Sequence, residues 1–138
     1  MNRLNVQLTT YIGLLPFYFP LIYSSISSDI TLREIFIEVS IIYGVMISSF
    51  ISGMQWQHII SNNKQYTIFP IIPFSLAWLH FLDFFVFFKE MIIIIALIVN
   101  LLIDFLILNK KRESWFKKMR IIATFLACSS FVINFLSV

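Results

Sequence analysis

The sequence has few charged residues, and this scarcity decides its broad class. Only 12% of the 138 residues are charged, whereas 59% are hydrophobic and 17% are aromatic. A water-soluble domain normally carries about a quarter charged residues, and it could not hide this much apolar surface. The composition therefore excludes an ordinary soluble fold and predicts an integral membrane protein.

Cysteine, glycine and proline are also scarce. The one cysteine, Cys128, lies within an apolar run, which excludes a disulfide framework or a thiolate metal site within one chain. No phosphate-binding loop, H-E-x-x-H pair, G-x-S-x-G elbow or Cys/His cluster is present, and there is no internal repeat. We therefore expect a single non-enzymatic domain over residues 1–138, without metal or cofactor.

Long apolar stretches dominate what remains. A helix needs about 20 mostly apolar residues to cross a bilayer, because each backbone polar group must pair internally where water is absent. Five stretches approach this length: Leu8–Ser25, Ile35–Trp56, Tyr66–Leu82, a fourth from Phe84 or Met91 to Leu108, and Met119–Val138. The sequence predicts an all-α bundle of about five membrane-spanning helices, with a tight turn between the third and the fourth.

Charge placement predicts the orientation of this bundle. With five spans, the side that holds the N-terminus collects eight of the ten basic residues: Arg3, Lys64, Lys110, Lys111, Arg112, Lys117, Lys118 and Arg120. The opposite side collects five of the seven acidic residues, Asp29, Glu34, Glu38, Asp83 and Glu90, with only Arg33 and Lys89. Because cytoplasmic loops keep an excess of Lys and Arg, we expect the N-terminus inside and the C-terminus outside.

Small side chains and prolines predict how the helices pack. Ser40, Gly44, Ser48 and Ser52 recur at four-residue intervals, and Gly53 widens the strip, so a neighbouring helix could approach closely along it. Pro16 predicts a kink in the first span, because its ring clashes with the carbonyl of Ile12. Pro70 and Pro73 fit the start of the third span, where a missing donor costs less.

Asp104 is the ionisable residue placed deepest in a predicted span, which makes it a functional candidate by default. A proton relay with Asn100, one helical turn earlier, is one reading. The reading that we favour is a structural ion pair with Arg120, because a short loop holds the inner ends of the fourth and fifth helices together. We expect a carboxylate-to-guanidinium distance below about 4 Å.

The remaining polar and aromatic residues predict anchoring at the membrane surface. His58 and His80 are placed at opposite faces, so they cannot share a metal or a haem, and Glu38 fits snorkelling or pairing with Arg33. Tryptophan is typical of membrane interfaces, which suits the three positions Trp56, Trp78 and Trp115. Although the net charge is +3, the basic residues lie between apolar runs, and we expect no nucleic-acid partner.

Several local patterns resemble one known family. They are Tyr11–Phe17 (YIGLLPF), Tyr43–Trp56 (YGVMISSFISGMQW), Pro73–Trp78 (PFSLAW), Asp104, and Trp115–Arg120 (WFKKMR). In this order they resemble the family of transmembrane protein 69 and its bacterial relatives, which share a domain of unknown function. The family pattern has two glycines and a histidine before the tryptophan, where this chain has Ser52, Gly53 and Gln55. The resemblance implies a multi-pass protein of a bacterial or mitochondrial inner membrane and brings no activity.

Two functions from different classes fit these observations. The first is an accessory or assembly subunit that packs against a larger membrane complex, for example a respiratory one, with the bilayer and other membrane proteins as its partners. The alternative is a binder or transporter of a small, lipid-like molecule, with an intramembrane cavity lined by Gln55, Trp56, Asn100 and Asp104. This second reading requires those side chains to converge on one pocket.

Overall fold

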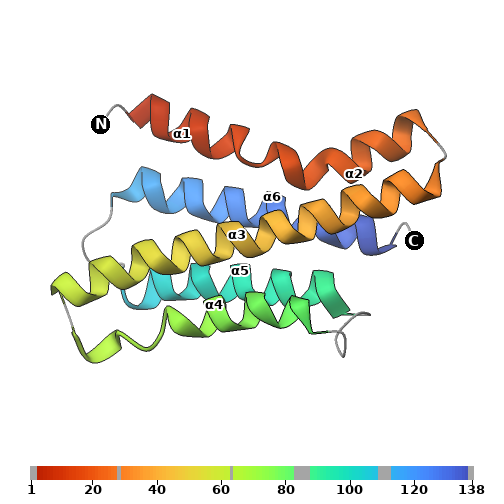
Figure 1. Ribbon diagram of the computed structural model, residues 1–138. Coiled ribbons are helices and arrows are strands. Elements are labelled where there is room, and N and C mark those ends of the chain that lie inside the picture. Colours follow the sequence, from red (N-terminus) through yellow and green to blue (C-terminus); the bar gives the residue numbers. More distant parts are fainter. Residues whose placement is uncertain (1–2, 28, 63, 83–87, 109–112, 137–138) are drawn as a thin grey trace.

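The computed structural model describes residues 3–27, 29–62, 64–82, 88–108 and 113–136 (Figure 1). Over these ranges the chain forms helices and no strand, which confirms the predicted all-α class. The α-helices are α1 (Arg3–Ile12), α2 (Leu15–Ile26), α3 (Ile30–Asn62), α4 (Ile71–Trp78), α5 (Lys89–Leu106) and α6 (Ser114–Leu136). Short 3-10 helices, η1 (Lys64–Tyr66) and η2 (Leu79–Phe81), flank α4.

The helices lie side by side as an elongated bundle in which neighbouring segments of the chain run in opposite directions (Figure 1). The long helix α3 packs against α2, α4 and α5, and α6 packs against α5 and α2. Helix α1 begins at one end of the bundle, and α6 finishes at the other end (Figure 1).

Two helices, α3 and α6, are long and apolar enough to cross a membrane, judged over the described part of the chain. Helices α1 and α2 together provide a third candidate if the bent pair is one span. Helix α5 has 18 residues, but it carries Lys89, Glu90 and Asp104, and α4 has only 8 residues. Length and composition therefore give two or three candidate spans, as expected of a membrane protein.

The kink predicted at Pro16 is present. Helices α1 and α2 meet at 41°, and Pro16 lies in the first turn of α2. The break exposes backbone groups, and the hydroxyl of Tyr43 in α3 donates a hydrogen bond of 2.8 Å to the carbonyl of Gly13. A side chain from the neighbouring helix thus stabilises the bend.

Helix bounds differ from the predictions mainly in the second and third segments. Helix α3 runs from Ile30 to Asn62, 33 residues, and so extends beyond both ends of the predicted Ile35–Trp56. At about 1.5 Å per residue it is roughly 50 Å long, more than a bilayer core of about 30 Å. The carboxylate of Asp29 caps its start by accepting the backbone N–H of Thr31 at 3.0 Å.

The third segment is less regular than the predicted Tyr66–Leu82. The backbone N–H groups of Phe69, Ile71 and Ile72 each donate to the carbonyl three residues earlier, and the α-helix begins only at Ile71. Pro70 and Pro73 have no N–H to donate, which accounts for the tight turns at this start. The tight turn predicted between the third and fourth segments falls at residues 83–87, outside the described residues.

The core is apolar and is centred on Gly44. Phe17 of α2 meets Tyr43 and Phe131 edge-on, with ring centroids 5.1 and 5.4 Å apart. A Cβ at Gly44 would lie 2.6 Å from Cγ2 of Ile93, so only glycine allows α3 and α5 to approach this closely. Every α-helix also exposes large apolar side chains, among them Leu8, Phe19, Phe50, Phe74, Leu102 and Phe125.

Candidate functional site

Polar side chains gather inside the bundle, where α3, α5 and α6 meet. Ser48, Ser52 and Gln55 come from α3, and Asn100 and Asp104 come from α5; all five are buried. They lie at helical spacing on the faces that these two helices turn toward each other, since residues three and four apart share a face. The exterior of the bundle is apolar, and most hydrogen-bonding groups of this site pair with one another, whereas Oε1 of Gln55 is buried without a hydrogen-bond partner among the described residues.

Asn100 is the centre of this network. Its amide nitrogen donates to the Ser48 hydroxyl at 2.9 Å, and its amide oxygen accepts from the Ser52 hydroxyl at 3.2 Å. Its backbone carbonyl accepts the Gln55 amide at 2.8 Å. The Ser48 hydroxyl in turn donates to the carbonyl of Pro73 at 3.4 Å, which extends the network to α4.

Asp104 connects this network to α6. Its Oδ1 accepts the Gln55 amide at 3.1 Å, and its Oδ2 accepts the Nε of Arg120 at 2.8 Å. The two side chains of the ion pair are 6% and 13% exposed, so water screens the pair only weakly. The 2.8 Å separation lies within the limit of about 4 Å that we set for the structural pair.

The predicted packing strip divides into a buried part and one exposed residue. Ser40, Ser48 and Ser52 are buried, and Gly44 touches α2, α5 and α6 through the core. At Gly53 an added Cβ would meet nothing within 4 Å, so this glycine makes no close helix contact among the described residues. Gly53 follows Ser52 directly and therefore lies about 100° around the helix, away from the buried face.

The predicted polar cavity is also corrected. Gln55, Asn100 and Asp104 converge, but they hydrogen-bond to each other and fill the space between the helices. Trp56 is 48% exposed and lies outside this group, because consecutive helical residues point about 100° apart. It borders a recess of about 290 Å³ on the outer face of α3 and α4, lined by Ser49, Ser52, Gly53, Trp56, Pro70, Ile71 and Phe74.

A second polar cluster was not predicted. Glu38 of α3 accepts two contacts from Lys89 of α5, at 3.2 and 3.3 Å, and its Oε1 lies 3.2 Å from Nε2 of His80 in η2. His80 is buried, whereas we expected it at the membrane surface, and for Glu38 we expected snorkelling or pairing with Arg33. The predicted topology had already placed Glu38, His80 and Lys89 on one side of the membrane, and this shared placement was the available signal.

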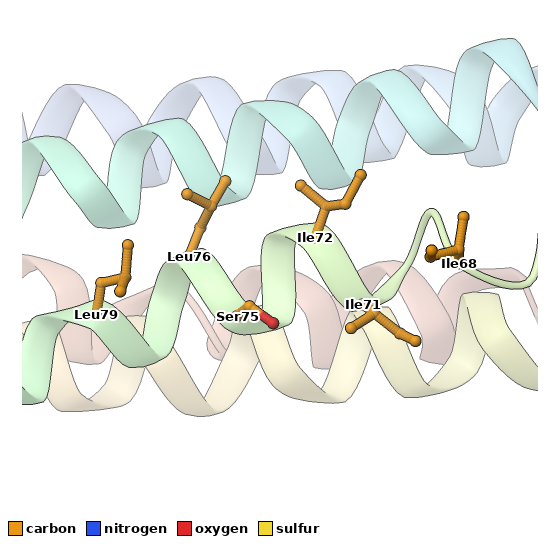
Figure 2. Close-up of a pocket in the computed structure, with 6 residues that line it drawn as sticks. All are labelled: Ile68, Ile71, Ile72, Ser75, Leu76 and Leu79. Carbon is orange, nitrogen blue, oxygen red and sulfur yellow. The ribbon is translucent and has the colours of Figure 1, made fainter.

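A further apolar pocket of about 300 Å³ lies along α4 (Figure 2). Its lining side chains come from the third segment of the chain: Ile68, Ile71, Ile72, Ser75, Leu76 and Leu79. In Figure 2 the side chains of Ile72, Leu76 and Leu79 project to one side of this segment, and those of Ile71 and Ser75 are directed elsewhere. Its lining carries no charged or titratable side chain.

The contacts of these polar side chains indicate a structural role in helix packing, not a catalytic role. The serine hydroxyls of the network are bound to Asn100 and to a backbone carbonyl, and the described residues contain no group of three or more His, Cys, Asp and Glu that could hold a metal ion. A buried, paired network of this kind fixes the register of the helices that it joins.

Comparison with known proteins identifies a family. A family model described as "Protein of unknown function (DUF3429)" matches residues 3–136, nearly the whole chain. No curated protein and no solved structure matches the chain. The match confirms the resemblance to a family defined by a domain of unknown function. The chain therefore belongs to the DUF3429 family.

Proposed function

We propose that this protein is a non-enzymatic accessory or assembly subunit that packs against a larger complex in a bacterial or mitochondrial inner membrane. In this proposal the chain crosses the membrane five times, with its N-terminus inside and its C-terminus outside. The crossings are α1 with α2, then α3, the segment from η1 to η2, α5, and α6.

The distribution of polar groups supports the two crossings that length alone does not favour. The charged residues of α5, Lys89, Glu90 and Asp104, lie near its two ends, and Asn100 is the one polar residue between them. Asp104 and Lys89 both meet opposite charges inside the bundle or at its edge. Helix α4 is short, but η2 continues it, and it packs beside α3 and α5 (Figure 1). Both segments therefore suit a bilayer better than their charge counts and lengths suggest.

The observation that carries the proposed function is the recess over Gly53. Ser49 and Gly53 lie four residues apart on α3, at a place where the bundle leaves open space, and Trp56 and Phe74 form its sides. Two small residues at this spacing let a second helix approach closely in a membrane, where packing drives association. The recess is thus shaped for a helix of a partner protein, and no helix among the described residues fills it.

Replacing Gly53 by Leu tests this surface. A photo-crosslinking residue at Phe74 should capture the same membrane protein reproducibly in native membranes, and the Gly53→Leu change should abolish that product by filling the recess. The folded protein should keep its thermal stability in detergent, because a Cβ at Gly53 would meet nothing within 4 Å and the recess leaves room for the rest of the side chain. A crosslinker at Phe125, which is exposed on α6, is the matched control and should not give this product.

Two outcomes would contradict the proposal. One is a crosslinked product that persists unchanged in the Gly53→Leu variant. The other is the same product arising equally from Phe125, since that would indicate random collisions within the membrane.

The alternative function, binding of a lipid-like molecule, has one supporting observation. The recess of about 290 Å³ is almost wholly apolar in its lining, which suits an acyl or isoprenoid chain. A ligand of this kind should be lost on Gly53→Leu and recovered from the wild-type protein by organic extraction. Mass spectrometry of the extract distinguishes a specific molecule from bulk membrane lipid.

A further inference from the structure

The start of α1 meets the first turn of α6 at one end of the bundle (Figure 1). The guanidinium of Arg3 lies 5.4 Å from the ring centre of Trp115, within the range of a cation–π contact. The indole N–H of Trp115 donates to the carboxylate of Glu113. The Trp115 ring therefore contacts Arg3 on its face and Glu113 at its edge.

The cations nearest to Trp115 differ from Lys89 and Arg120 in how their charge is balanced. Lys89 and Arg120 each lie within 4 Å of a carboxylate. Arg3, Lys117 and Lys118 have no carboxylate of the described residues at that distance, and Glu113, which directly precedes α6, is bound to Trp115. This end of the bundle thus presents positive charge that the described part of the protein does not neutralise.

Helix geometry separates the two lysines. Lys118 is three residues after Trp115 and lies beside it on the helix, whereas Lys117 is two residues after it and points to another side. Arg3 therefore lies over the Trp115 ring, and Lys118 lies on the same side of α6 as Trp115. Tryptophan rings prefer the depth of lipid headgroups, which places these two charges at the level of the phosphates.

We propose that Arg3, Trp115 and Lys118 form a binding site for the headgroup phosphate of an anionic phospholipid. This inference rests on the membrane location in the proposed function. The two cations neutralise the phosphate, and the indole ring packs against the glycerol region of the same lipid. Anionic lipids of a membrane surface attract each nearby Lys or Arg, and the attraction weakens with salt.

The test uses the full-length protein in detergent micelles, titrated with dioleoyl phosphatidylglycerol, with dioleoyl phosphatidylcholine or with inorganic phosphate. Native mass spectrometry should show retention of phosphatidylglycerol in preference to phosphatidylcholine. The Arg3→Gln and Lys118→Gln changes should each weaken that retention by about fivefold, as expected for one interfacial cation. Lys117→Gln is the matched control on the same turn and should change it by less than twofold, and Arg3→Lys should restore most of the binding.

Equal retention of the two lipids would overturn this inference, and so would a Lys117→Gln effect as large as that of Lys118→Gln. Competition by inorganic phosphate at concentrations similar to those of the lipid would also overturn it, because the ligand would then be free phosphate. Far-ultraviolet circular dichroism identifies any variant that fails to fold. In that case the lipid preference of the charge-preserving Arg3→Lys variant is compared with that of the wild type. The Phe74 crosslink reports separately on the proposed function, so loss of lipid preference with an intact crosslink removes only the lipid site.

Discussion

Replacing Arg120 by Met should destabilise the protein by about 3–5 kcal/mol, because it leaves the Asp104 carboxylate buried without its counter-charge. Asp104→Leu should have a similar effect, since it leaves the guanidinium of Arg120 inside the bundle. Removing both partners should cost at least about 2 kcal/mol less than either single change, because no charge then stays unpaired. Gln55 would keep its hydrogen bond to the Asn100 carbonyl in the double variant.

The measurement is the free energy of unfolding from detergent denaturation in mixed micelles, for the wild type, the two single variants and the double variant. Lys118→Gln is the control on the same helix, and as an exposed change it should stay within about 0.5 kcal/mol. If the single and double variants lose equal stability, the pair does not act as a unit, and Asp104 becomes a functional candidate again.

Replacing Gly44 by Leu should lower the free energy of unfolding by about 3 kcal/mol or more. Overpacked interiors usually lose about 1–3 kcal/mol. A Cβ alone would lie 2.6 Å from Ile93 and 3.3 Å from Phe131, so α3 would have to separate from α5 and α6. Replacing a glycine inside a helix by a better helix former stabilises the helix by about 1 kcal/mol, which does not offset this clash.

Gly53→Leu is the matched control, because it is the same change in the same helix. The helix-propensity gain is common to both variants, and only Gly44 has neighbours within 4 Å of the new atom. Thermal melting in detergent should therefore separate the two variants clearly. Equal melting temperatures would show that α3 does not approach its neighbours closely at Gly44.

These two sites illustrate what the sequence could predict. Spacing by four residues identifies Ser40, Gly44, Ser48 and Ser52 as one face, because a helix fixes which residues share a side. The Asp104–Arg120 contact was predictable because chain connectivity alone brings the ends of two consecutive helices together. Both arguments use only local geometry, and neither needs the arrangement of the other helices.

The rest depends on contacts between distant segments. Gly53 and Trp56 each follow a buried residue by one position, and only the placement of α4 shows that both border an outer recess. Likewise, Glu38 meets His80 and Lys89 because three segments converge at one end of the bundle. The length of α3 was underestimated because its polar ends do not resemble a span, yet they continue the helix beyond the apolar part.

The central claim is that the segments from η1 to η2 and α5 each cross the membrane, giving five crossings in all. Cysteine labelling at Leu82, the exposed residue that follows η2, tests this most directly.

In a Cys128→Ala background, single cysteines at Ser27, Leu82 and Ser114 are treated with a membrane-impermeant maleimide in intact cells and after permeabilisation. Five crossings predict that Leu82→Cys reacts in intact cells, as Ser27→Cys does, while Ser114→Cys reacts only after permeabilisation. With three crossings, Ser27→Cys and Ser114→Cys would each react as they do with five crossings. Only the reaction of Leu82→Cys therefore distinguishes five crossings from three. Labelling of Leu82→Cys only after permeabilisation, in parallel with Ser114→Cys, would contradict the five-span account.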